Sequence, residues 1–299
     1  MTGWSGLDEH RRGQAAVALA AVFWSSAGIL QRELSMNIQT QLAGRALFAS
    51  LALGMYAVRS DTSRPAWAVF RSMGGAGLAV AASTAVASGS FIYAINHTTV
   101  AHVLFMQAAS PIVAALLAWS VLGERASRRT VAAMIVALVG VGVMIGDPRG
   151  GAWLGDASSL LMAFSFAIAI VITRHRREVS MAPAMCLAQV MILVTFAPLC
   201  SPGQVGPRDG LLLVAMGVGQ MGFAMALFTV GARLIPAAEA ALLTLLEVVL
   251  GPLWVWVGVG ERPNTATLIG GAIVVGAVVL QARGDRAPID VAAAERVAA

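Results

Sequence analysis

The sequence of 299 residues contains no lysine, so arginine alone carries its positive charge. Charged residues of both signs make up only 12% of the chain, whereas a soluble domain carries about 25%. So few charges cannot cover a water-facing surface, which excludes an ordinary soluble globular protein. Hydrophobic residues reach 58%, which also excludes a largely disordered chain. The composition therefore indicates an integral membrane protein.

Cysteines and enzyme motifs are scarce as well. The only two cysteines, Cys186 and Cys200, fall in one apolar stretch, where fourteen helical positions separate them by about 21 Å, beyond disulfide reach. We expect both to be packing residues. The sequence has no H-E-x-x-H motif, no Walker A loop and no G-x-S-x-G elbow. These absences favour a protein that is not an enzyme and needs neither metal nor cofactor.

Long apolar stretches fill nearly the whole chain. A membrane-spanning helix needs about 20 largely apolar residues. Because the linking turns are short, little room is left for a domain outside the membrane. The expected fold is an all-α membrane protein with ten transmembrane helices, at residues 14–35, 38–58, 72–96, 98–122, 129–146, 154–174, 182–200, 209–233, 237–260 and 265–283.

The arginines are distributed unevenly along these stretches. Fifteen of the twenty fall in segments expected on the same side of the membrane as the N-terminus, and five fall toward the other side. Cytoplasmic loops carry such an excess, so both termini are expected in the cytoplasm. A basic balance of this kind reflects loop charge and does not indicate nucleic-acid binding. A lysine-free chain rich in alanine, valine and glycine fits a GC-rich bacterium, and hence its inner membrane.

A short motif occurs twice. Residues 119–125 and 256–262 both read W-x-x-x-G-E-R at the end of an apolar stretch, 137 positions apart. A second echo relates residues 23–27 to 163–167 at an offset of 140. The chain therefore reads as two tandem five-helix repeats, and because five is odd the second repeat is inverted. Inverted repeats around a site near the membrane midplane are a recurrent plan of transporters.

The repeat divides the chain into three parts. Residues 14–146 form the first five-helix repeat and residues 154–283 the second. Residues 284–299 are expected to form a disordered cytoplasmic tail. Glycines in the fifth and tenth stretches predict close packing of those helices, either within the chain or as a dimer seam. They are Gly140, Gly142, Gly146, Gly270, Gly271 and Gly276.

Ten helices in two halves, each with a fourth helix that ends in G-E-R, resemble the EamA-type members of the drug/metabolite transporter superfamily. Residues 109–117 match the fourth-helix motif of that family, and Arg45 fits its second helix. In the second half, Val248 stands where the family has proline, and Pro252 follows four residues later. We therefore expect the ninth helix to bend at a different level from the fourth.

The resemblance implies a basket of ten helices around a central cavity, with the fifth and tenth helices peripheral. The chain looks closest to the YddG-type exporters of aromatic and other amino acids. The implied function is a secondary transporter that exports amino acids or similar small metabolites by alternating access, as a monomer or weak homodimer. The alternative is a multidrug or toxic-cation exporter. A membrane-embedded enzyme or scaffold is a third class, which an inverted repeat does not favour.

Two carboxylates lie in the ninth stretch, where ionisable groups are functional candidates. Glu247 near its middle is either a proton-coupling or amine-binding group, or a buried acid that is hydrogen-bonded to a neighbouring helix. Glu239 lies near the cytoplasmic end, where a solvated ion pair with Arg233 competes with a role as a substrate ligand. Its counterpart in the first repeat is His102, either a second gate or a solvated side chain at a helix end.

Arg45 lies about two turns into the second stretch. It either reaches the membrane surface or pairs with Glu33, or it binds a substrate carboxylate. A metabolite cavity needs a few polar groups among apolar and aromatic walls. The side chains of this kind that we expect to line the cavity are Trp24, Ser25, Tyr93, Met106, Gln107, Phe164, Gln220 and Phe223.

Overall fold

A computed structural model describes residues 8–97, 103, 106–145, 153–260 and 263–282. Over these residues the chain is helical and contains no β-strand. His102 and Gly146, together with residues 284–299 of the expected tail, lie outside the described residues. The helices of the first part of the chain are α1 (Glu9–Ser25), α2 (Ala27–Arg32), α3 (Ile38–Ser60), α4 (Ala66–Ser72), α5 (Gly74–His97), α7 (Ser110–Leu122) and α8 (Arg128–Ile145).

The second part of the chain contains one helix with unusual geometry. Residues Ala215–Phe223 form η3, a π-helix that joins two α-helices end to end. The remaining elements are α9 (Trp153–His175), α10 (Ala182–Phe196), the short 3-10 turns η1 (Ala197–Leu199) and η2 (Pro202–Gln204), α11 (Pro207–Val214), α12 (Ala224–Leu234), α13 (Ala237–Thr244), α14 (Leu246–Val259) and α15 (Thr265–Ala282).

Six of the described helical segments are long and apolar enough to cross a membrane, or seven if the bent pair α4–α5 is one span. The axis of that pair turns by 82° at the junction. The other expected stretches are interrupted, shorter or partly outside the described residues. Ten spans therefore stay a prediction, whereas a multi-span helical membrane protein is what the structure describes.

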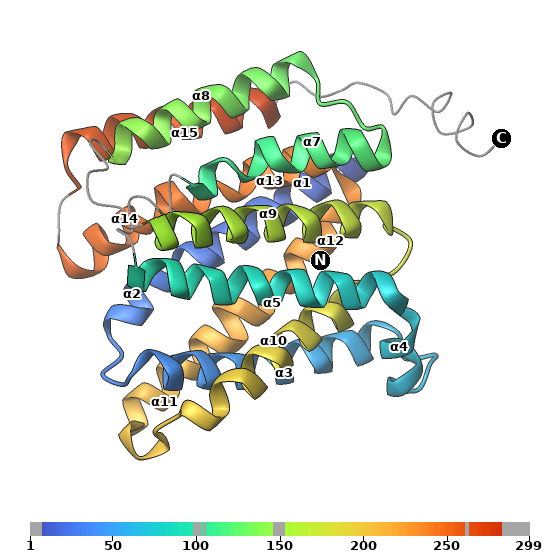
Figure 1. Cartoon of the computed structure of the whole chain (residues 1–299), viewed down its shortest axis with the longest axis vertical. Coiled ribbons are helices and arrows are strands. Elements are labelled where there is room, and N and C mark those ends of the chain that lie inside the picture. The colour runs from blue at the N-terminus through green and yellow to red at the C-terminus, as the bar shows by residue number, and fades with distance from the viewer. Residues whose placement is uncertain (1–7, 98–102, 104–105, 146–152, 261–262, 283–299) are drawn as a thin grey trace.

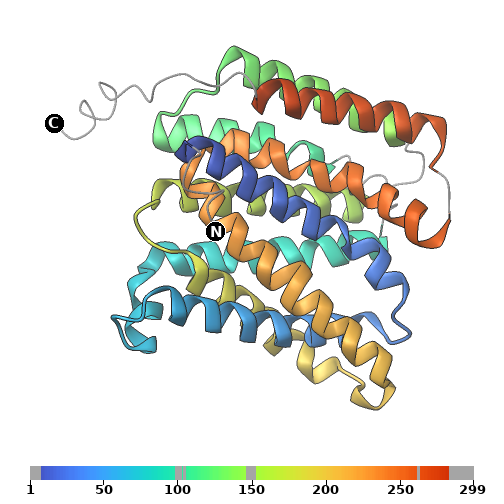
Figure 2. The same ribbon diagram turned by 180° about the vertical axis from the view of Figure 1, so that it is seen from behind.

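The helices form one elongated bundle (Figure 1). α8 and α15 lie side by side along one edge in both views (Figures 1 and 2), and α3 packs against α10 toward the opposite edge. Between these pairs α5 packs on α9, α12 on α1, and α7 on both α9 and α13. Segments from the first and second parts of the chain therefore alternate through the bundle.

Glycines bring several backbones into direct contact. A Cβ atom added to Gly140 on α8 would lie 2.9 Å from the carbonyl oxygen of Gly270 on α15. A Cβ atom added to Gly231 on α12 would lie 2.7 Å from the carbonyl oxygen of Gly13 on α1. Only glycine allows such approaches, which is how small residues drive helix association in membranes. The glycine seam between α8 and α15 is therefore within the chain.

Candidate functional site

Several helices are interrupted within the stretches expected to span the membrane. The turn at Ser26 separates α1 from α2, and the turn at Leu245 separates α13 from α14. At Ala109, just before α7, the backbone N–H donates to the carbonyl of Met106, and at Leu245 it donates to Leu242, both at 3.1 Å. In both bonds the donor and the acceptor are three residues apart, whereas they are four residues apart in an α-helix. Non-helical backbone at this depth is tolerated where protein or a cavity surrounds it.

The interruptions at Ala109 and Leu245 lie at matching positions. They are 136 residues apart, one fewer than the spacing of the two W-x-x-x-G-E-R motifs. The expectation that the ninth helix bends at a different level, at Pro252, is therefore wrong. Pro252 lies inside continuous α14, and the break comes at Leu245 although Val248 replaces the proline. A proline is thus not needed for a break at this level.

Aromatic rings meet next to the first interruption. The ring of Trp24 lies 6.2 Å from Phe166 of α9 and 5.2 Å from Phe228 of α12, measured between ring centroids. Phe166 and Phe228 are themselves 5.7 Å apart. The neighbouring Phe23 meets Phe223 of η3 edge to face at 5.0 Å. Such pairs contribute about 0.5–1.5 kcal/mol beyond simple burial, so they fix the ring positions.

Polar groups accompany these rings. The amide of Gln220 donates to the carbonyl oxygen of Trp24 at 3.5 Å, and the indole of Trp254 donates to the hydroxyl of Ser25 at 2.8 Å. The Gln220 Oε1 and Trp24 Nε1 atoms are buried and find no hydrogen-bond partner in the described part of the chain. A buried polar atom without a partner costs about 1–3 kcal/mol. Gln220 and Trp24 therefore supply one unsatisfied acceptor and one unsatisfied donor.

We define the central cluster as the residues gathered here from five elements. Four of them, Trp24, Ser25, Gln220 and Phe223, were predicted from the sequence, and Phe223 joins the others only through its contact with Phe23. The other three were missed, because Phe and Trp in an apolar stretch look like ordinary packing residues. The complete set is Trp24, Ser25, Phe166, Gln220, Phe223, Phe228 and Trp254.

Two charged side chains lie on helices that contact the cluster. Glu247 shares one face of α14 with Gly251 and Trp254, since their spacing is four and three residues. Gly251 approaches Ser25, because a Cβ added to it would lie 3.9 Å from the Ser25 carbonyl oxygen. Glu247 is half-buried and makes no hydrogen bond or ion pair with the described residues. It therefore faces α1 without a neutralising partner there.

Arg45 lies on α3 where that helix contacts η3. A Cβ added to Gly217 would lie 2.8 Å from the Arg45 carbonyl oxygen, so the two backbones touch one turn from Gln220. The Arg45 Nε atom is buried without a partner among the described residues. The alternative of an Arg45–Glu33 pair is wrong, because Glu33 pairs with Arg208 instead. A cation and an anion in the membrane segments are thus both unpaired within the described structure.

Glu239 has a different environment from the one expected. It is only 1% exposed, and its Oε1 atom accepts from Gln14 at 2.6 Å and lies 3.2 Å from His10 Nε2. The expectation of a solvated pair with Arg233 is therefore wrong, since Arg233 donates to the carbonyl of Arg177. Sequence reasoning missed this because α1 and α13 are more than 200 residues apart in the chain.

The remaining predicted cavity residues do not join the central cluster. Tyr93 stacks on His97 near the end of α5, with 44% of its surface exposed. Phe164 is exposed on α9 with Leu160 and Leu161, whereas Phe166 two residues later reaches Trp24. Met106 and Gln107 are half-buried just before the turn at Ala109. Their roles stay predictions.

The turn at Ala109 leads directly into α7. There the hydroxyl of Ser110 is buried without a partner in the described structure. No group of three or more His, Cys, Asp or Glu side chains among the described residues is arranged to hold a metal ion.

Comparisons with known proteins agree with this architecture. The model of the EamA-like transporter family matches residues 11–146 and 153–282. An uncharacterized transporter of Archaeoglobus fulgidus is 26% identical over 276 residues, which cover 90% of this chain and 96% of the relative. One protein of known crystal structure aligns with a TM-score of 0.73 at 20% identity, over 90% of this chain and 96% of that one. The chain belongs to the EamA-like transporter family and is a multi-pass membrane transporter.

Proposed function

We propose that this protein is a secondary transporter that exports amino acids or similar small metabolites across a bacterial inner membrane by alternating access. The observation that carries the proposal is the central cluster, where aromatic rings and unsatisfied polar atoms meet beside interrupted helices. Ligand sites combine apolar walls with a few polar groups in this way. Membership in a transporter family favours transport over catalysis.

The charges around the cluster favour a zwitterionic substrate. Arg45 lies on one side, on the helix that touches η3, and Glu247 lies on the other side, on α14. Unpaired ionisable groups in membrane segments are costly and mark ligand or ion pathways. A substrate carboxylate complements the guanidinium, a substrate ammonium complements the carboxylate, and an apolar side chain of the substrate fits the rings. An amino acid carries all three features.

Two inverted five-helix repeats are the architecture we propose for this mechanism. The two family matches coincide closely with the expected halves at 14–146 and 154–283. The packing pattern is also unchanged when the halves are exchanged. In this exchange α1 corresponds to α9 and α5 to α12, so the contact of α5 with α9 becomes the contact of α12 with α1. The pairs α3–α10, α8–α15 and α7–α13 each join two corresponding helices and stay the same. Ten spans with both termini in the cytoplasm fit this symmetry, and the arginine distribution supports the orientation.

Uptake of labelled amino acids into vesicles containing the purified protein tests the proposal, with and without an imposed pH gradient. Saturable uptake of several amino acids is the expected result, with Arg45→Gln reducing uptake by at least about tenfold through loss of a charge-assisted hydrogen bond. If uptake follows the gradient in the wild type and ignores it in Glu247→Gln, Glu247 is the coupling site. Absence of any amino-acid uptake contradicts the proposal.

A multidrug or toxic-cation exporter is the second candidate, and Glu247 is the observation that favours it. An unpaired carboxylate beside aromatic rings suits an organic cation as well as an amino acid, since cations also bind ring faces. The same vesicles distinguish the candidates. Uptake of tetraphenylphosphonium that requires Glu247 but not Arg45 supports the cation exporter, whereas an amino acid requires both residues.

A further inference from the structure

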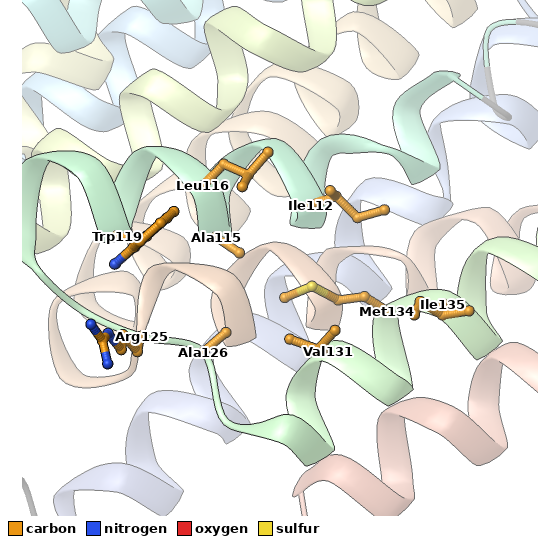
Figure 3. Close-up of a pocket in the computed structure, with 9 residues that line it drawn as sticks. All are labelled: Ile112, Ala115, Leu116, Trp119, Arg125, Ala126, Val131, Met134 and Ile135. Carbon is orange, nitrogen blue, oxygen red and sulfur yellow. The ribbon is translucent and has the colours of Figure 1, made fainter.

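A groove of about 540 Å³ runs between α7 and α8, and none of its lining residues belongs to the central cluster. Its walls are almost entirely apolar, and one basic side chain stands among them. The lining residues are Ile112, Ala115, Leu116, Trp119, Arg125, Ala126, Val131, Met134 and Ile135 (Figure 3).

The groove opens toward the membrane. Leu116, Trp119 and Ile135 are each more than half exposed in the isolated chain. Val131 and Ile135 lie four residues apart on one face of α8, and the other face packs against α15 through Gly140. In a multi-pass membrane protein an exposed apolar surface of this kind contacts lipid. In the membrane the groove is therefore accessible to acyl chains.

The two ends of the groove differ in charge. Trp119 and Arg125 lie together at one end, and Ile112 and Ile135 lie toward the other (Figure 3). Tryptophan and arginine at the end of a span are typical of the interface between hydrocarbon and headgroups. The basic end of the groove therefore lies at headgroup depth.

Arg125 is not neutralised by its neighbour in the chain. Glu124 turns to α9 and pairs with Arg174 at 3.0 Å. Arg125 and the nearby Arg128 are exposed and make no hydrogen bond or ion pair with the described residues. Arg129 is used differently, since it donates to the carbonyl of Leu280. Arg125 lines the groove, and Arg128 lies three residues before Val131 on the same face of α8, so two unpaired cations belong to this end of the groove.

We propose that this groove is a binding site for one anionic phospholipid, with an acyl chain between α7 and α8 and the phosphate at Arg125 and Arg128. The occupant follows from the charge pattern. A partner helix or a second copy of the chain would need carboxylates at this level to pair with the arginines, whereas every anionic headgroup carries a phosphate at this depth. Basic pockets between transmembrane helices bind anionic headgroups for this reason. The site is independent of the central cluster and of the transported substrate.

Native mass spectrometry of lipid retained after mild detergent extraction tests the site. The full chain is reconstituted in vesicles of equal parts phosphatidylglycerol and phosphatidylcholine, then extracted. We expect one retained phosphatidylglycerol per chain in the wild type. Arg125→Gln should reduce that retention roughly fivefold, because one arginine contributes about that factor near a headgroup. Ala115→Phe, which fills the groove, should reduce it without changing any charge.

Arg71→Gln is the matched control, because Arg71 is an exposed arginine on the short helix α4, outside the groove. It should retain phosphatidylglycerol as the wild type does. Three results overturn the proposal. The first is that the wild type retains phosphatidylglycerol and phosphatidylcholine equally. The second is that Arg125→Gln and Arg71→Gln lose equal amounts of phosphatidylglycerol. The third is that the wild type forms a dimer without bound lipid and that Ala115→Phe dissociates this dimer. The comparison requires that the Arg125→Gln protein is folded and monodisperse, so that a loss of lipid does not result from misfolding or aggregation.

Discussion

Different kinds of contact join distant segments of the chain at the two ends of the bundle. At the end that holds the N-terminus, Glu239 of α13 is buried and bonded to His10 and Gln14 of α1. There too Arg174 of α9, 9% exposed, joins Glu124 and the carbonyl of Arg233. We call these contacts the N-terminal-end ties. Each contact contains one buried ionisable side chain of a helix, Glu239 or Arg174.

At the opposite end, loops supply one exposed ion pair, together with hydrogen bonds that include two from Ser35 to the buried carboxylate of Asp209. Arg208 pairs with Glu33, and their side chains are 76% and 43% exposed. Ser35 donates to Asp209 at 3.0 Å, and Asn37 donates to Ser201 at 3.3 Å. Exposed pairs of this kind contribute about 0–1 kcal/mol, whereas removal of one partner from a buried pair costs about 3–5 kcal/mol.

The difference in burial between the contacts at the two ends indicates which end opens more easily. The alternating access that we propose requires each end to part in turn, and the contacts at both ends join the first part of the chain to the second. Opening the N-terminal end exposes buried charges that lose their partners, so it costs more free energy. The opposite end parts with smaller losses. These contacts therefore predict that the N-terminal end parts less easily than the opposite end.

The largest effect is expected from Glu239→Ala. This change removes the acceptor of Gln14 and the partner of His10 inside a buried contact. We expect a loss of about 3 kcal/mol in the free energy of unfolding. Thermal unfolding in detergent, followed by tryptophan fluorescence, measures it. An unfolding midpoint equal to that of the wild type would show that the contact does not hold this end.

Arg174→Gln should have the second largest effect. It leaves Glu124 without its cation and Arg233 without a donor to its carbonyl. Glu124 is partly exposed, so we expect a smaller loss of about 2 kcal/mol. The same thermal measurement applies, and Arg174→Lys serves as the conservative comparison because it keeps the charge but not the forked geometry. Equal stability of all three proteins would remove this contact from the N-terminal-end ties.

Ser35→Ala tests the stronger contact at the opposite end. The change deletes the hydroxyl that donates to Asp209 and leaves the backbone N–H of Ser35 at 3.4 Å from the same carboxylate. We expect a loss of about 1 kcal/mol, as for a single hydrogen bond. A loss as large as that of Glu239→Ala would erase the difference between the ends.

Arg208→Gln should have the smallest effect. Its pair with Glu33 is exposed on both sides, so we expect a change below about 0.5 kcal/mol that high salt abolishes. Thermal unfolding of the variant and the wild type at low and high salt measures it. A large loss of stability that does not depend on salt would mean that the contacts at the opposite end stabilise the protein as much as the N-terminal-end ties do.

Much of this architecture was predictable from the sequence because it depends on local composition. The spans predicted at 38–58, 154–174 and 265–283 match α3, α9 and α15 within two residues at each end. The packing of α8 on α15 followed from their glycines. Contacts between distant segments were not predictable, since no pattern in one sequence indicates that Gln14 meets Glu239 or that Phe166 meets Trp24.

The central cluster shows the same limit at the level of single residues. Trp24 and Gln220 were chosen because aromatic and amide groups in a span need a reason to be there. Phe164 was chosen and Phe166 was missed, and only the rotation of α9 separates the exposed ring of Phe164 from the half-buried ring of Phe166 that reaches Trp24. Gln189, a fully buried amide on α10 with no partner in the described structure, shows that a polar group in a span is not enough.

The pair Gln220 and Gln189 provides the most direct test of the central claim, that the cluster binds the transported substrate. Both are buried amides, and replacement by leucine preserves their approximate volume. Initial rates of labelled amino-acid uptake into vesicles should fall at least about tenfold for Gln220→Leu, since a hydrogen bond to a charged substrate contributes about 1.5–3 kcal/mol. Gln189→Leu should transport like the wild type. Equal rates for the two variants would contradict the account.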